Sequence, residues 1–254
     1  MSSKVVLHVE GSVATITLNR PEVLNAFDSD TWASLERTAL DIISQPEIRV
    51  VILTGAGDRA FSTGLDLKAL ASGPIRAPIP HRNGIDLVAK LQRIFNMYDE
   101  LPVPVVAAIN GYCLGVGLEL SLCCDIRIAA ENAVFALPEV DLGIIPDMGG
   151  TQRLPKIVGP GHAKEIIYTA RRINAAEALR IGLVNHVYPE EQLMKEAHGL
   201  ADEIAAKQPA SVQAAKKAIN VGTSAGLHTG LAYENALVAN VVSEVKKVAG
   251  VEIT

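Results

Sequence analysis

Two glutamates, Glu119 and Glu139, are the candidates for acid–base chemistry in this chain of 254 residues. Glu119 is the only charged residue between Leu101 and Cys124. The segment 115–124 is predicted to be a helix that is apolar on every face, so Glu119 should be largely buried. A buried carboxylate costs several kcal/mol unless it is paired, hydrogen-bonded or protonated, and no Lys or Arg lies nearby in the sequence. The pattern favours a functional carboxylate, although a structural glutamate paired with a distant arginine would produce the same pattern.

Glu139 lies in an acidic segment that has no basic residue between Arg127 and Arg153. The acidic residues of this segment are Glu131, Glu139, Asp141 and Asp147. Pro138 fixes the backbone directly before Glu139, which suits a positioned side chain. An exposed acidic loop would explain the composition equally well, so the pattern alone leaves both interpretations open.

Two glycine-containing segments are candidates for binding loops. Residues 50–58 (VVILTGAGD) resemble the start of a dinucleotide site, but the third glycine and the helix-opening pattern are missing, so we expect no nicotinamide or flavin cofactor. Residues 115–119 (GVGLE) are predicted to open a helix. The free N–H groups and the positive dipole end of that helix could face a developing anion. The alternative is that the glycines serve a tight turn that requires small residues. The two interpretations do not exclude each other.

Metal and disulfide chemistry are not expected. The six histidines are scattered, without ligand-like spacing, at positions 8, 81, 162, 186, 198 and 228. The three cysteines are Cys113, Cys123 and Cys124. An odd number of cysteines, two of them adjacent, is not typical of a disulfide framework. We expect buried free thiols in a reducing compartment and therefore a cytoplasmic protein. The first residues also lack the features of a signal peptide.

The elements that must position these residues alternate between strand and helix, which predicts an α/β fold. The expected elements are a hairpin over 5–18, a helix from Asp28 to Pro46, a buried strand over 50–53, a loop over 73–83, a helix over 87–98, and buried strands over 103–109 and 125–130. After Pro189 the chain is predicted to be wholly helical. One apolar stripe in this tail should pack on the core or on a partner subunit; it consists of Leu231, Val238, Val241, Val245 and Val248.

Composition excludes several classes of function. The chain is 49% hydrophobic with a net charge of -5, which is typical of a globular protein of one large domain, or of one domain with an appendage. It has no basic run, so nucleic acid is not an expected partner. The uncharged stretch from Leu101 to Leu118 contains two prolines and three glycines, which predicts buried core and not a membrane span.

Four segments, in this order, resemble the crotonase (enoyl-CoA hydratase/isomerase) family. They are residues 16–27 (ITLNRPEVLNAF), 60–67 (AFSTGLDL), 108–120 (AINGYCLGVGLEL) and 137–154 (LPEVDLGIIPDMGGTQRL). The similarity runs over about residues 5–190, and a helical tail is also typical of the family.

The resemblance implies a fold and a substrate. Residues 1–190 should form a spiral of ββα repeats with the active site, and residues 191–254 a helical C-terminal region for oligomerisation into a trimer or hexamer. The substrate should be an acyl-CoA thioester, with no other cofactor and no metal. The backbone N–H groups of Leu65 and Val116 should form an oxyanion hole. Family members usually carry glycine where this chain has Val116, and a branched side chain there should narrow the acyl pocket.

The resemblance also implies roles for the acids. Glu119 and Glu139 match the two carboxylates of the family's hydratases; we assign Glu119 to activating water for attack at C3 and Glu139 to delivering a proton to C2. Asp147 stands where 3,5-to-2,4-dienoyl-CoA isomerases use a second base, so isomerisation is the alternative. Other reactions of the family, and a non-catalytic CoA-binding or scaffold role, rank lower.

Two segments are expected to bind CoA by the same resemblance. Leu24 and Ala26 belong to the part that should line the adenine pocket. The part that should run past the pantetheine contains Ser62, Thr63, Gly64, Asp66, Leu67 and Lys68. Arg20 and Lys68 are the candidate phosphate cations, and either could equally be a solvated surface charge.

Overall fold

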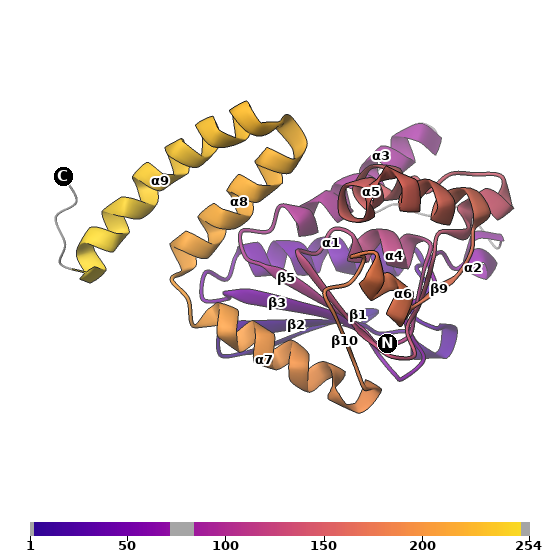
Figure 1. Ribbon diagram of the computed structural model, residues 1–254. Helices are drawn as coiled ribbons and strands as arrows, with labels where there is room; N and C mark the ends of the chain where they lie inside the picture. Colours follow the sequence, from indigo (N-terminus) through magenta and orange to yellow (C-terminus); the bar gives the residue numbers. More distant parts are fainter. Residues whose placement is uncertain (1–2, 72–83, 250–254) are drawn as a thin grey trace.

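The computed structural model of the chain describes residues 3–71 and 84–249, which are built around two sheets (Figure 1). The six-stranded sheet has the order β1-β2-β3-β5-β7-β10, and the four-stranded sheet the order β4-β6-β8-β9. The strands of the first are β1 Val5–Glu10, β2 Val13–Leu18, β3 Val50–Gly55, β5 Val105–Ile109, β7 Ile126–Ala130 and β10 His186–Tyr188. Those of the second are β4 Ala60–Ser62, β6 Tyr112–Leu114, β8 Val134–Ala136 and β9 Ile173–Asn174.

The two sheets are connected by a repeat. A strand of the large sheet is followed by a strand of the small sheet three times in succession, from β3 to β4, from β5 to β6 and from β7 to β8, and helical turns follow each pair. The short strands β4, β6 and β8 pair in parallel in the same order as β3, β5 and β7. This arrangement is the ββα spiral expected from the resemblance, and the predicted antiparallel hairpin of β1 and β2 is also present.

Helices cover both faces of the large sheet. Their bounds are α1 Ser29–Ile43, α2 Leu67–Ala71, α3 Gly84–Asp99, α4 Val116–Ser121, α5 Gly150–Thr169, α6 Ala175–Arg180, α7 Leu193–Ala205, α8 Pro209–Ala225 and α9 Leu227–Ala249. Three 3₁₀ turns are η1 Pro21–Val23, η2 Pro138–Leu142 and η3 Glu190–Gln192. Helix α1 begins where Asp28 and Thr31 form a capping box. Helix α4 is shorter than the predicted 115–124 segment. The predicted loop 73–83 lies outside the described residues.

Each residue of β3 and β5 is buried, as expected for parallel strands covered on both faces. On one face, Phe27, Trp32 and Phe95 form an aromatic cluster beneath α1 and α3. The other face is covered by α7, whose buried residues Leu193, Ala197, Ala201 and Ala205 form one cluster with inward residues of the sheet.

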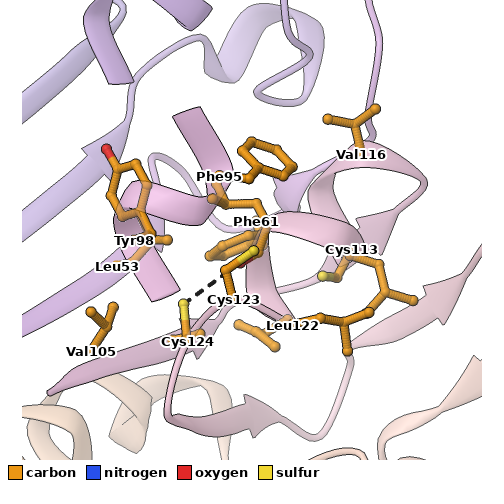
Figure 2. Close-up of a cluster of buried hydrophobic side chains, with 14 of the residues drawn as sticks. Leu53, Phe61, Phe95, Tyr98, Val105, Cys113, Val116, Leu122, Cys123 and Cys124 are labelled. Carbon is orange, nitrogen blue, oxygen red and sulfur yellow. Dashed lines mark hydrogen bonds between the residues drawn. The ribbon is translucent and has the colours of Figure 1, made fainter. Parts of the chain in front are cut away.

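The three cysteines lie inside the main apolar cluster (Figure 2). All three are free and buried, which confirms the expectation of unpaired thiols. Burial raises the pKa of Cys113 and of Cys124 to about 12, and it raises the pKa of Cys123 further. These thiols are therefore protonated at neutral pH and unsuited to nucleophilic chemistry.

The α8–α9 hairpin projects from one side of the body (Figure 1). Lys216 anchors α8, because its buried Nζ donates to Asp125 Oδ2 at 2.8 Å and to the Val103 carbonyl at 3.0 Å. Helix α9 packs back along α8. Of the predicted apolar stripe, Leu231 is 46% and Val238 50% exposed, and the side chains of residues 245 and 248 lie outside the described part. Among the described residues, no helix combines the length and apolarity that a membrane span requires.

Candidate active site

Glu119 sits in the first turn of α4 and is 1% exposed. Its Oε1 accepts two backbone hydrogen bonds, from the N–H of Met148 at 2.9 Å and from the N–H of Gly150 at 2.8 Å. Its Oε2 is buried and has no hydrogen-bond partner among the described groups. Within the described part of the chain no arginine or lysine forms an ion pair with Glu119, so the interpretation as a structural glutamate paired with a distant arginine finds no support.

Glu139 comes from the 3₁₀ turn η2, directly after Pro138, and is also buried. Its carboxylate lies against the N-terminus of α4: a β-carbon on Gly115 would come within 3.0 Å of Oε1. Oε2 of Glu139 is buried and lacks a hydrogen-bond partner among the described groups. The interpretation of Glu139 as part of an exposed acidic loop is therefore wrong, because the turn points this acid inward.

Burial raises the pKa of both glutamates, to about 8 for Glu119 and to about 7 for Glu139. The N–H groups of Met148 and Gly150 oppose the shift at Glu119, while the nearby negative charges of Glu139 and Asp147 add to it. Asp147 precedes α5, is half-buried, and has a pKa raised by burial. Near neutral pH this group of acids therefore retains at least one proton, which suits a site that must both accept and donate protons.

The two predicted oxyanion donors have free N–H groups in the described part of the chain. Phe27 donates to the Gly64 carbonyl at 2.8 Å and accepts from the Asp66 N–H at 3.0 Å. Because Phe27 bonds both peptide groups that flank Leu65, the N–H of Leu65 points to the opposite side. Val116 is the first residue of α4, where an N–H has no intrahelical acceptor.

Close packing between α4 and the segment after β4 brings these two donors together. A β-carbon on Gly64 would come within 3.3 Å of the Val116 nitrogen. A β-carbon on Gly117 would come within 2.6 Å of the Ser62 carbonyl oxygen. Glycine at both positions is therefore required for the close approach of the two segments.

The two segments expected to bind CoA lie side by side. Thr63 N–H donates to the Leu24 carbonyl at 3.1 Å, and Ser62 Oγ donates to the Asn25 carbonyl at 2.8 Å. Leu24 and Asn25 both adopt left-handed conformations, with φ of 55° and 56°. The Asn25 amide ties this strained turn to β4 by donating to the Ala60 carbonyl at 2.7 Å. The sequence analysis placed Asn25 in a CoA-binding segment but did not predict that it holds this turn, although asparagine is one of the residues that adopt the left-handed conformation.

The two candidate phosphate cations lie in different settings. Arg20 is nine-tenths buried, and its Nη2 lies 3.1 Å from Asp28 Oδ2 and 3.0 Å from Asp66 Oδ2. This arginine therefore holds the turn before α1 and the segment before α2 together. Lys68 is exposed on α2, so of the two cations it is the one accessible to a phosphate.

One serine of the chain, Ser224, has the spacing of a known nucleophile motif. Gly-x-Ser-x-Gly occurs at Gly222–Gly226, but its Ser224 lies in the last turn of α8 and not at a strand–helix elbow. The Ser224 hydroxyl accepts a hydrogen bond from the exposed Lys156 at 3.1 Å. The position does not suit a nucleophilic serine.

Comparison with known proteins shows the family of this chain. The family model for enoyl-CoA hydratase/isomerase matches residues 8–252. Short-chain-enoyl-CoA hydratase of Clostridium acetobutylicum is 42% identical over 233 residues, which cover 92% of this chain and 87% of that protein. Carnitinyl-CoA dehydratase of Escherichia coli K12 is 44% identical over 217 residues, covering 85% and 80%. The crystal structure of an enoyl-CoA hydratase from Bacillus anthracis has a TM-score of 0.89 and 41% identity, covering 97% of this chain and 94% of that one. The chain belongs to the enoyl-CoA hydratase/isomerase family and has the crotonase fold.

Proposed function

We propose that the protein is an enoyl-CoA hydratase, which adds water across the 2,3 double bond of a 2-enoyl-CoA thioester. The observation that carries the proposal is the placement of two buried carboxyl groups, unpaired with any described cation, beside two free backbone N–H groups. The N–H groups of Leu65 and Val116 would hold the thioester oxygen as it gains enolate charge. One such donor is typically worth about 3–4 kcal/mol of transition-state stabilisation.

The carboxyl groups complete the proposed reaction. Glu119, as a carboxylate, takes a proton from the water whose oxygen attacks C3. Glu139, as the acid, gives a proton to C2, so the proton lost from water is balanced by the proton gained at C2. The order of the pKa values alone would leave the last proton on Glu119. The N–H groups of Met148 and Gly150 already lower the pKa of Glu119, and because they can only donate they hold its ionised form in place. The proposed reaction uses the fraction of the protein in which Glu119 is ionised and Glu139 carries the proton.

A spectroscopic assay tests this proposal. Purified protein is added to crotonyl-CoA, and the absorbance of the enoyl-thioester is followed over time. We expect the band to disappear with the wild-type protein and the rate to fall by about 10²–10⁴-fold in Glu139→Gln. Glu131→Gln, at an exposed acid outside the site, serves as the control. Near-normal turnover by Glu139→Gln would show that this acid does not deliver the proton.

Isomerisation of a 3,5-dienoyl-CoA is the second candidate, because Asp147 lies close enough to raise the pKa of both Glu119 and Glu139. A third acid in the site could accept a proton at a more distant carbon. Turnover of 3,5-dienoyl-CoA without consumption of crotonyl-CoA, abolished by Asp147→Asn, would favour this alternative over hydration.

We also propose that the chain assembles as a homotrimer, or as a hexamer of two trimers, in the cytoplasm. Exposed apolar side chains on the projecting hairpin support an interface there: Ile219 is 63%, Leu227 is 74% and Val238 is 50% exposed. Light scattering of the purified protein tests the assembly, and a monomer would contradict it. The buried free thiols are compatible with a reducing compartment.

A further inference from the structure

A single peptide group connects helix α3 to Glu119. The Nε2 of Gln92, on α3, donates to the carbonyl oxygen of Asp147. The N–H of the same peptide group belongs to Met148, and it donates to Glu119 Oε1 at 2.9 Å. The two hydrogen bonds therefore form a continuous chain from the Gln92 amide through one peptide unit to the carboxylate.

The next peptide group of the turn is also fastened to α3. Arg153 Nη1 donates to the Met148 carbonyl at 3.3 Å, and its Nη2 donates to Asn96 Oδ1 at 2.6 Å. Asp99, three residues further along α3, lies 3.5 Å from the same Nη2. Helix α3 thus holds two successive carbonyls of the turn that presents N–H groups to Glu119, one directly and one through Arg153.

We propose that Gln92 is a positioning residue, which fixes the Asp147–Met148 peptide group and thereby sets the orientation and charge of Glu119. Hydrogen bonds in a chain polarise one another, so a donor at the carbonyl strengthens the N–H on the other side of the peptide. Gln92 is only partly exposed and does not contact Glu119 itself through any hydrogen bond in the described structure. Its effect must therefore pass through the peptide group.

The groups that face Glu119 predict the direction of the effect. Glu139 from η2 and Asp147 from the turn raise its pKa, as does burial, whereas the N–H groups of Met148 and Gly150 lower it. Replacing Gln92 leaves both acids and the Gly150 N–H in place and weakens the Met148 donor. Loss of Gln92 should therefore raise the pKa of Glu119.

Titration of Glu119 by NMR tests the proposal without any substrate. The protein carries ¹³C-labelled glutamate, and the Glu119 resonance is assigned by its loss in Glu119→Gln. In Gln92→Met the pKa of Glu119 should rise by about 0.4–1 pH unit, the equivalent of one neutral hydrogen bond. Gln152→Met is the matched control, because Gln152 is exposed on α5 and its side chain donates to Thr151. An unchanged pKa in Gln92→Met would overturn the proposal.

Kinetics supply the second test, which rests on the proposed hydratase function. In Gln92→Met, kcat at pH 7 should fall about 2- to 10-fold with KM nearly unchanged, and the acid limb of the pH–rate profile should move to higher pH. Gln92→Leu also lacks the donor and adds no charge, so it should behave in the same way even if the methionine variant folds poorly. A rise in KM alone would assign Gln92 to substrate binding and overturn the proposal. If the wild-type protein hydrates no enoyl-CoA, the proposed function fails, while the titration still decides the role of Gln92.

Discussion

The carboxylate of Glu139 lies against Gly115: a β-carbon on this glycine would come within 3.0 Å of Glu139 Oε1, which is closer than side chains normally pack. Gly115 also has a φ of 52°, which a β-carbon would disfavour. This residue precedes Val116, the first residue of α4. Gly115 therefore places the proposed proton donor, Glu139, directly beside a proposed oxyanion donor, the N–H of Val116. Protonation at C2 and stabilisation of the neighbouring enolate oxygen can then occur side by side.

Removing the N–H of Val116 should remove catalysis while leaving the fold intact. Proline is tolerated at the first position of a helix, and no intrahelical bond depends on this N–H. We expect Val116→Pro to lower kcat by about 10²–10³-fold. Val116→Ala keeps the N–H and should stay close to the wild-type rate, with a shifted preference towards bulkier acyl groups because the smaller side chain leaves more space. Steady-state kinetics with several chain lengths check both variants, and an active proline variant would exclude this donor.

A larger residue at position 117 should move the two proposed oxyanion donors apart. Its β-carbon would lie 2.6 Å from the Ser62 carbonyl oxygen and 2.8 Å from Ser62 Cβ, so α4 would have to move. We expect Gly117→Ala to cost about 1–3 kcal/mol of unfolding free energy and to lower kcat. Gly161→Ala is the control, since a β-carbon there would meet no atom within 4 Å. Equal stability and activity of the two variants in urea unfolding and turnover assays would contradict the close packing.

The free energy of unfolding should fall as the pH rises from about 5 to about 8. The pKa of Glu119 is about 8 in the folded protein against an ordinary value of 4.5, so in this interval the folded state binds more protons than the unfolded chain and loses stability as pH increases. Glu119→Gln carries no charge, and its amide oxygen can still accept from Met148 and Gly150. The free energy of unfolding of Glu119→Gln minus that of the wild type should increase by more than about 1 kcal/mol between pH 5 and pH 8. Urea unfolding at a fixed protein concentration measures this difference. A difference in unfolding free energy that does not change with pH would mean that burial does not raise the pKa of the Glu119 carboxyl group.

Lys68 and Arg20 should respond differently to substitution. Lys68→Ala should raise KM for an acyl-CoA but not for the matching acyl-pantetheine, which lacks the nucleotide phosphates. Arg20→Met leaves Asp28 and Asp66 without a cation in a partly buried setting and should lower the free energy of unfolding by about 1.5–3 kcal/mol. Thermal melts and the two KM values separate the roles, and a melting temperature unchanged by Arg20→Met would contradict a structural role.

The sequence predicted the helices and strands that have a clear hydrophobic periodicity, and it predicted the acidic residues that lie in unusual sequence surroundings. The hairpin 5–18, the helix after Asp28 and the buried strands were evident from periodicity and capping. Glu119 could be identified because a single charge in a long apolar stretch requires compensation. The compensation itself could not be predicted, since its donors, Met148 and Gly150, are brought to Glu119 only by the tertiary fold.

The residues of the small sheet and the ion pairs of Arg20 could not be identified from local sequence patterns, for physical reasons. Strands β4, β6 and β8 have three residues each, too few to show an alternating pattern. Asp66 is 46 residues from Arg20 in the sequence, so the sequence alone could not distinguish a buried ion pair from a free phosphate cation. The packing of α4 on the segment after β4 likewise follows from the spiral and not from any local pattern.

The three-fold repetition of long strand and short strand has a consequence for how such a protein can change. Leu65 follows β4, Val116 and Glu119 follow β6, and Glu139 follows β8, so each layer of the spiral contributes at least one of the proposed functional groups from the segment after its short strand. The strands hold the layers together through backbone hydrogen bonds that do not depend on the side chains in those turns. We therefore expect that the groups of one layer can change during evolution without a change in the other layers. Replacing the acid at position 139 would change where the substrate is protonated, while the two proposed N–H donors would still bind the same carbonyl oxygen.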